Sequence, residues 1–181
     1  MNLRLRRAQP RDAPEAQAAY RQIIEHLAAT VDFPHWHTEN HPTPTEVEQW
    51  ITLGDLYLAV AQAETRVGEK IAGVVVLNHA APDAYEEAPW SVEVPPEQVL
   101  VVHALGVNPA FLRQGVARFL VDASREIARE KGCRVVRLDT YIENIPAREL
   151  YTHNGFADLG VHTLHYQGTD LNQFHLFEYV L

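Results

Sequence analysis

Residues 112–118 carry a clear chemical signal, because a glycine, a small residue and two arginines gather where a helix is expected to begin. An apolar strand precedes them and an apolar helical pattern follows. The first N–H groups of a helix have no partner within the helix and lie at the positive end of its dipole. Gly115 and Ala117 leave room for a phosphate, and Arg113 and Arg118 add positive charge. The spacing predicts an anion-binding loop, although glycine in such a turn can also serve packing alone.

A second group of residues shares one face of a short helix. Asn144, Ala147 and Tyr151 are separated by three and four residues, which places them side by side on the helix surface. The small Ala147 stands between two polar side chains, so this face suits contact with a cofactor. The alternative is that Tyr151 is an ordinary aromatic residue packed on a sheet.

One imidazole lies in the apolar strand before the loop. His103 alternates with Leu105 and Val107 and therefore shares their side of the strand. An imidazole titrates near neutrality and can accept a proton from an ammonium group, directly or through water. A lone histidine in such a strand can equally be a hydrogen-bonded core residue. Gly106, near the end of this strand, predicts a bulge or a close backbone approach.

Two of these stretches resemble the motifs of the GNAT superfamily of N-acetyltransferases. Residues 112–117 match the acyl-CoA loop, whose pattern is Gln/Arg-x-x-Gly-x-Gly/Ala, except at Leu112, where the usual polar residue is missing and Arg113 could make its contact instead. Residues 144–156 match the second motif, Asn-x-x-Ala-x-x-x-Tyr followed by Gly-Phe. Two motifs in the family's order and separation are more specific than either alone. The resemblance covers about residues 1–181.

The resemblance implies an α/β (α+β) fold, with a central mixed sheet of six to seven strands, about four flanking helices and central parallel strands that splay apart. It implies acetyl-CoA (coenzyme A) as cofactor, with the freed backbone at Leu105 and Val107 pairing with the pantetheine arm. It assigns Asn144 to that arm and Tyr151 to the general acid, since a phenol of pKa ~10 is still protonated at neutral pH. The residues expected to contact the cofactor are Leu105, Val107, Leu112, Arg113, Gln114, Gly115, Val116, Ala117, Arg118 and Asn144.

The implied activity is transfer of an acetyl group from acetyl-CoA to an amine by direct attack in a ternary complex. This chemistry needs a held thioester, a deprotonated amine and a proton for the departing thiolate. We expect His103 as the base; Asp139 and Glu143 are rivals, and many family members use water chains. The alternative function is a non-catalytic acyl-CoA-binding sensor or interaction module. Asn144 and Tyr151 together favour catalysis.

Hydrophobic periodicity and capping residues predict the elements that position these groups. Asp12 and Thr45 are the expected N-caps of the first two helices, and a polar turn containing Gly68 is expected between the second and third strands. Strands are predicted over residues 3–7, 56–63, 70–78, 99–107, 134–140, 156–164 and 176–180, and helices over residues 14–27, 46–53, 116–131 and 145–153.

Two irregular segments are the candidate acceptor site. Residues 31–44 hold three prolines, a tryptophan and three histidines, and residues 79–98 form a long, acidic, proline-rich connection. The histidines could bind a metal, but a substrate-facing wall is the preferred interpretation, and we expect no metal; packing of the loop onto the core is a further alternative. Carboxylates beside aromatic rings attract a primary ammonium group. The residues expected to bind this amine substrate are Trp36, Glu39, Tyr85 and Trp90.

Composition limits the classes of partner. With 181 residues and 46% apolar residues, the chain is expected to form one domain, residues 1–181. A net charge of −9 is unfavourable for nucleic acid, so the expected partner is a small-molecule or peptide amine. The single cysteine, Cys133, excludes an internal disulfide, and the longest apolar run, residues 71–77, is too short to cross a bilayer. We expect a cytoplasmic protein with no membrane partner; a homodimer is left open.

Overall fold

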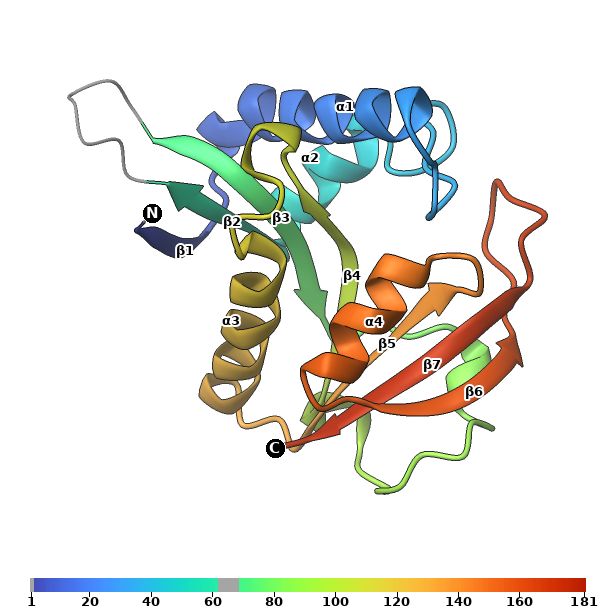
Figure 1. Cartoon of the computed structure of the whole chain (residues 1–181). Helices are drawn as coiled ribbons and strands as arrows, with labels where there is room; N and C mark the ends of the chain where they lie inside the picture. Colours follow the sequence, from blue (N-terminus) through green and yellow to red (C-terminus); the bar gives the residue numbers. More distant parts are fainter. Residues whose placement is uncertain (1, 62–68) are drawn as a thin grey trace.

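The computed structural model describes residues 2–61 and 69–181 and contains one mixed sheet of seven strands (Figure 1). The strand order is β1-β2-β3-β4-β5-β7-β6, and only the pair β4–β5 is parallel. This confirms the predicted mixed sheet. The strands are β1 (Leu3–Arg7), β2 (Leu56–Ala61), β3 (Lys70–Asn78), β4 (Val99–Val107), β5 (Val135–Tyr141), β6 (Ala157–Thr163) and β7 (Gln173–Val180).

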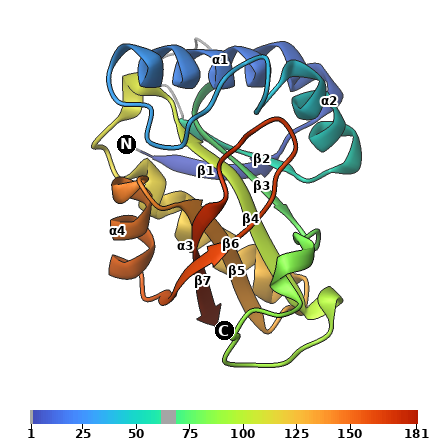
Figure 2. The ribbon, with the colours of Figure 1, turned by 90° about the vertical axis from the view of Figure 1, so that its right-hand side faces the viewer.

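Four α-helices cover the described part of the sheet, as predicted: α1 (Ala13–Ala29), α2 (Pro44–Leu53), α3 (Val116–Glu130) and α4 (Ile145–His153). Helices α1 and α2 pack in one core cluster with Leu58 and Val60, whereas α3 and α4 share another with Tyr57 and Ala59. These residues alternate along β2, so the two helix pairs cover opposite faces (Figure 2). None of the described helices has both the length and the apolar character needed to span a membrane.

Several element boundaries differ from the predictions for local reasons. Helix α2 begins at Pro44, because Thr43 rather than Thr45 is its N-cap: the Thr43 hydroxyl accepts a hydrogen bond from the Glu46 N–H, and the Glu46 carboxylate accepts one from the Thr43 N–H. Asp12 occupies the predicted N-cap position of α1, but its side chain makes no capping hydrogen bond, because its carboxylate pairs with Arg6 and accepts the Gln9 N–H.

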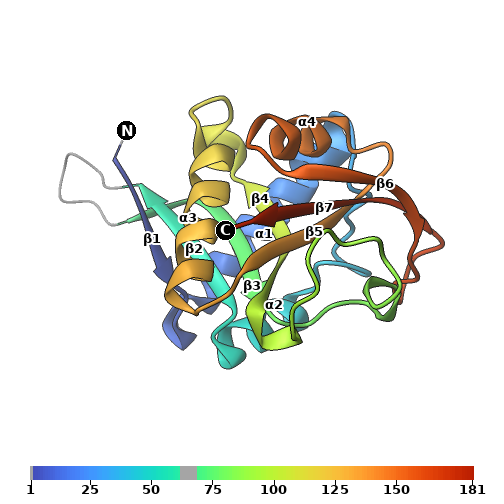
Figure 3. The ribbon, with the colours of Figure 1, turned by 90° about the horizontal axis from the view of Figure 1, so that it is seen from below.

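Strand β7 begins at Gln173, earlier than predicted, because its first residues pair with the ends of both β5 and β6 (Figure 3). The predicted end of the second strand at residues 62–63 and the turn containing Gly68 lie outside the described residues.

Strands β4 and β5 pair over a short length and then separate. Their register runs only from Val99↔Val135 to Val101↔Arg137, although both strands continue beyond it. On the β5 side, the rest of β4 therefore has no neighbouring strand in the sheet. The predicted splaying of the central parallel strands is confirmed.

The long connection between β3 and β4, residues 79–98, is anchored by a buried ion pair. The Arg137 guanidinium of β5 donates to the Glu178 carboxylate of β7 at 2.9 Å, and the two side chains are only 8% and 1% exposed. Arg137 also donates to the Val92 carbonyl and lies over the Trp90 ring, while the Ser91 N–H donates to Glu178. Because the connection bonds to these buried charges, residues 90–92 are fixed against β5 and β7.

The first testable prediction concerns this ion pair. Arg137→Met leaves the Glu178 carboxylate buried without its cation, so the free energy of unfolding should fall by about 3–5 kcal/mol in urea denaturation. The matched control is Arg129→Met, which removes an exposed pair with Glu126 and should change stability by no more than about 0.5 kcal/mol. Equal effects of the two substitutions would contradict the anchoring role.

Candidate functional site

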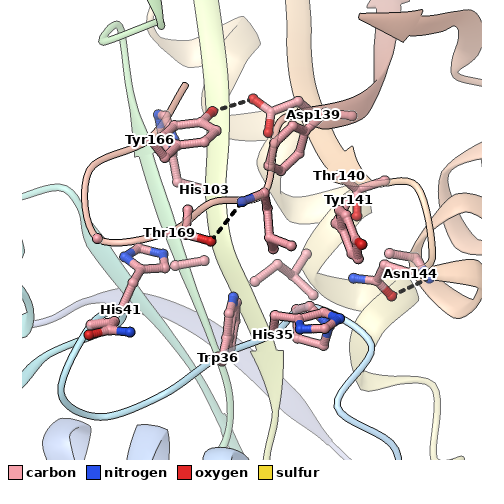
Figure 4. Close-up of a pocket in the computed structure, with 18 of the residues that line it drawn as sticks. His35, Trp36, His41, His103, Asp139, Thr140, Tyr141, Asn144, Tyr166 and Thr169 are labelled. Carbon is pink, nitrogen blue, oxygen red and sulfur yellow. Dashed lines mark hydrogen bonds between the residues drawn. The ribbon is translucent and has the colours of Figure 1, made fainter. Parts of the chain in front are cut away.

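The separation of β4 from β5 opens a cleft of about 960 Å³. Its walls come from β4, β5, α4, the segment between α1 and α2, and the segment between β6 and β7 (Figure 4). Residues that line it include His35, Trp36, His41, His103, Leu105, Asp139, Tyr141, Asn144, Tyr151, Tyr166 and Asp170. The cleft therefore brings together groups from almost the whole length of the chain.

Strand β4 contains a bulge where it borders the cleft. Val76 of β3 pairs with His103 and Val74 pairs with Gly106, so Ala104 and Leu105 together stand opposite one residue. The bulge lies before the predicted position, Gly106. That glycine is instead a point of close approach, because a Cβ there would lie 2.9 Å from the Ile23 side chain of α1. The bulge therefore lies in the part of β4 that has β3 on one side and no paired strand on its β5 side.

The predicted anion-binding loop follows β4 after a single 3-10 turn, Pro109–Phe111. Arg113 and Gly115 have φ values of +60° and +81°, and α3 begins with Val116. Among the described residues, the backbone N–H groups of residues 113–118 find no hydrogen-bond acceptor. A Cβ built on Gly115 would meet nothing within 4 Å, so the space in front of the loop is open. This run of N–H groups fits a pyrophosphate.

The side chains of the loop differ in what they offer. Val116 is 1% exposed and packs in the core, so only its N–H is available to a ligand. Leu112 is exposed, and the Gln114 amide donates to the Ala110 carbonyl. Arg118 is exposed, with its guanidinium 3.8 Å from Asp122. The backbone N–H groups are therefore the main free donors of the loop, with the exposed Arg113 and Arg118 beside them.

Tyr151 and Asn144 lie on the α4 side of the cleft, together with Ala147. The Tyr151 ring packs against Phe156 and Phe177, and its hydroxyl forms no hydrogen bond with another described residue. Burial raises the pKa of Tyr151, and the charge of Asp139 raises it further, so the phenol stays protonated. Asn144 is the N-cap of α4, and its side-chain oxygen Oδ1 accepts the Ala147 N–H. Its side-chain NH2 group is left as a donor.

Asp139 of β5 is a partly buried carboxylate in the wall of the cleft. Its Oδ2 accepts hydrogen bonds from the Tyr85 hydroxyl at 2.7 Å and the Tyr166 hydroxyl at 2.6 Å. Burial raises the pKa of Asp139, and the two tyrosine hydroxyls oppose that rise. A carboxylate with a raised pKa is a better proton acceptor than an exposed one.

His103 is held in one tautomer by its partners. Its Nε2 lies 2.9 Å from the Asn78 side-chain oxygen and 3.0 Å from the Ala80 carbonyl. The Asn78 amide nitrogen donates to Asp55, so both atoms facing Nε2 are acceptors and Nε2 carries the proton. Burial lowers the pKa of His103 to about 4. The ring is therefore neutral at neutral pH, with Nδ1 as its lone-pair nitrogen.

Of the four predicted substrate-binding residues, the structure brings only Trp36 to the cleft. Glu39 is exposed and outside the lining residues. Tyr85 and Trp90 do not line the cleft and instead belong to a hydrophobic core cluster. The Tyr85 hydroxyl donates to Asp139, and the Trp90 indole donates to the Tyr85 carbonyl. The connection contributes Ala80 to the lining.

The segment between β6 and β7 supplies another wall of the cleft. Residues 166–171, between β6 and β7, all line the cleft. A Cβ on Gly168 would lie 3.8 Å from the Asn40 carbonyl, so this segment reaches the one between α1 and α2. Tyr166, an aromatic residue in a polar stretch, is the sequence feature that could have indicated a role for this segment in the site.

The histidines of residues 31–44 each face a carboxylate. His35 lies 3.8 Å from Glu143, His37 lies 3.5 Å from Asp32, and His41 lies 3.0 Å from Glu46. Within the described ranges, no three His, Cys, Asp or Glu residues come together as metal ligands. All three histidines line the cleft, and the His41 ring also lies edge-on to Trp36 and Trp50.

Comparison with known proteins gives the same family as the motifs. The model of the acetyltransferase (GNAT) family matches residues 20–156. A mycothiol acetyltransferase of Beutenbergia cavernae is 32% identical over 112 residues, covering 62% of this chain and 36% of that protein. The corresponding protein of Jonesia denitrificans is 28% identical over 142 residues, covering 75% of this chain and 40% of its own length. The chain thus spans less than half the length of these curated relatives.

Solved structures share the fold at low identity. A GNAT-family acetyltransferase from Listeria monocytogenes aligns with a TM-score of 0.74 at 19% identity, covering 99% of this chain and 95% of that chain. The structure of yncA from Salmonella typhimurium with its cofactor acetyl-CoA aligns with a TM-score of 0.65 at 15% identity, covering 100% and 95%. Because the family model matches most of the chain, including both motifs, the chain belongs to the GNAT family of acetyltransferases.

Proposed function

We propose that the chain transfers an acetyl group from acetyl-CoA to a primary amine by direct attack in a ternary complex. The observation that carries this proposal is the continuity of the donor side: the free edge of β4 borders the cleft and leads into the unpartnered N–H groups of residues 113–118. Asp139 and Tyr151 face the same cleft, which favours catalysis over a purely binding role.

The donor is held mainly by backbone groups. Residues 113–118 bind the pyrophosphate, the main chain at Leu105 and Val107 pairs with the pantetheine arm, and the Asn144 amide donates to it. Bound acetyl-CoA supplies the reactive thioester. The chain contributes by holding that thioester next to the amine, and proximity of this kind lowers a barrier by several kcal/mol.

The proton transfers are assigned from burial and hydrogen bonding. Tyr151 is the proposed acid, because its protonated hydroxyl has no other partner among the described residues. Asp139 is the proposed base, directly or through water, because its pKa is raised. Because the pKa of His103 is lowered to about 4, its ring is a poor proton acceptor at neutral pH, and its Nδ1 instead accepts a hydrogen bond from the incoming amine.

The acceptor is proposed to be a positively charged primary amine that enters between residues 31–44 and residues 166–171. Trp36 and Tyr166 offer aromatic surfaces, and Asp170 and Asp139 offer negative charge, on the walls of the cleft. The cytoplasmic location expected from the sequence stays a prediction, and a homodimer stays a possible assembly of the chain.

The activity is tested by release of free thiol from acetyl-CoA in the presence of a panel of primary amines. The parent protein should show amine-dependent release, and Tyr151→Phe should lower kcat by roughly one to three decades with little change in KM for acetyl-CoA. The control is Tyr179→Phe, since Tyr179 also packs against Phe156 but does not line the cleft. No release with any amine would refute the proposed function, and an unchanged kcat would reduce Tyr151 to a packing residue.

A second prediction tests the donor loop by calorimetry. Gly115→Val should weaken acetyl-CoA binding by about tenfold or more, because the new side chain occupies the open space in front of the N–H groups. Gly132→Val is the matched control: Gly132 has φ +74° and equally open surroundings, but it follows the other end of α3. If both variants bound acetyl-CoA as tightly as the parent, the loop would not be the phosphate site.

A third prediction concerns the pH dependence of kcat/KM. The value should rise with pH through the pKa of Asp139, because the base acts as the carboxylate. Tyr85→Phe removes a donor that stabilises this charge, so the pKa of Asp139 rises further and the limb moves to higher pH. His103→Gln should leave the limb in place. If the rise of kcat/KM with pH were instead lost in His103→Gln and unchanged in Tyr85→Phe, His103 would be the base.

A further inference from the structure

The bulge in β4 holds Ala104 in a conformation that alanine rarely adopts. Its φ is +46°, within the left-handed region, although it lies inside a strand. A residue with a Cβ is strained there, and such strain persists only where the surroundings impose it. The two flanking residues, His103 and Leu105, also line the cleft. The conformation of Ala104 therefore decides how the backbone is presented to the cleft.

One side chain from another element is bonded to this residue. The Tyr20 hydroxyl of α1 donates a hydrogen bond to the Ala104 carbonyl at 2.8 Å. Tyr20 is 2% exposed, and burial raises the pKa of its hydroxyl, so it stays protonated and acts as a donor. A bulge disrupts the strand ladder, and a buried carbonyl needs a partner. Tyr20 supplies that partner and opposes a return of Ala104 to an extended conformation.

The Tyr20 ring also contacts the wall on the acceptor side. It lies between Trp36 and Trp50, with ring centroids 6.1 and 5.9 Å away, and both tryptophans line the cleft. Trp36 also approaches β4 closely, since a Cβ on Gly106 would lie 3.4 Å from the Trp36 ring. Tyr20 therefore touches both the acceptor wall and the strand edge that borders the donor.

We propose that Tyr20 is a positioning residue, whose hydroxyl holds the β4 bulge in the conformation that presents the Leu105 backbone to the acyl-CoA arm. This inference rests on the proposed function, since the ligand of that backbone is the arm of acetyl-CoA. Tyr20 acts through Ala104 and does not itself line the cleft.

The test is Tyr20→Phe, which keeps the ring between the tryptophans and removes only the hydroxyl. Acetyl-CoA affinity in calorimetry should fall by about tenfold, the effect of losing one well-placed hydrogen bond. Backbone amide hydrogen exchange at Leu105 and Gly106, measured by NMR without ligand, should become faster. The matched control is Tyr57→Phe, because Tyr57 is equally buried and accepts a hydrogen bond from Arg7 away from the cleft.

A second substitution separates positioning from a general loss of stability. Glycine adopts positive φ freely, so Ala104→Gly added to Tyr20→Phe should recover acetyl-CoA affinity by about threefold or more. The proposal is overturned if Tyr20→Phe binds and exchanges like Tyr57→Phe, or if the double variant recovers nothing. A parent protein that does not bind acetyl-CoA would refute the proposed function instead, and the exchange measurement would still report on the bulge.

Discussion

The short pairing between β4 and β5 is the constraint on which the rest of the site depends. After Val101↔Arg137 the two strands have no common ladder, so part of β4 has backbone groups without strand partners on that side. Sheet backbone normally satisfies its polar groups by pairing, and an interrupted ladder leaves them for a ligand. The cleft and the free edge both result from this separation.

Burial in the cleft acts in opposite directions on its two candidate bases. It lowers the pKa of His103 to about 4 and raises the pKa of Asp139, because in each case it disfavours the charged form. The hydrogen bonds from the two tyrosine hydroxyls stabilise the charged carboxylate of Asp139 and so limit the rise of its pKa. One physical cause thus makes the histidine a neutral hydrogen-bonding group and increases the proton affinity of the aspartate.

Features that depend on neighbours in the chain were predicted correctly. Gly115 ahead of an apolar helical pattern indicated a helix start with free N–H groups, and the spacing of Asn144 and Tyr151 indicated one helix face; the structure has both. The order of strands and helices also followed from periodicity. Thr43 and Thr45 show the limit of local patterns, since both lie at the start of α2 and backbone geometry selects Thr43 as the cap.

The sequence by itself therefore determined the elements, the anion-binding loop and the α4 face, because each is encoded within a few residues. Only the tertiary structure decided which distant groups meet. It buried Tyr85 behind Asp139, brought Tyr166 to the cleft and bonded Tyr20 to the Ala104 carbonyl. Contacts between residues far apart in the chain, and the pKa shifts that follow from burial, depend on packing and have no signature in local spacing.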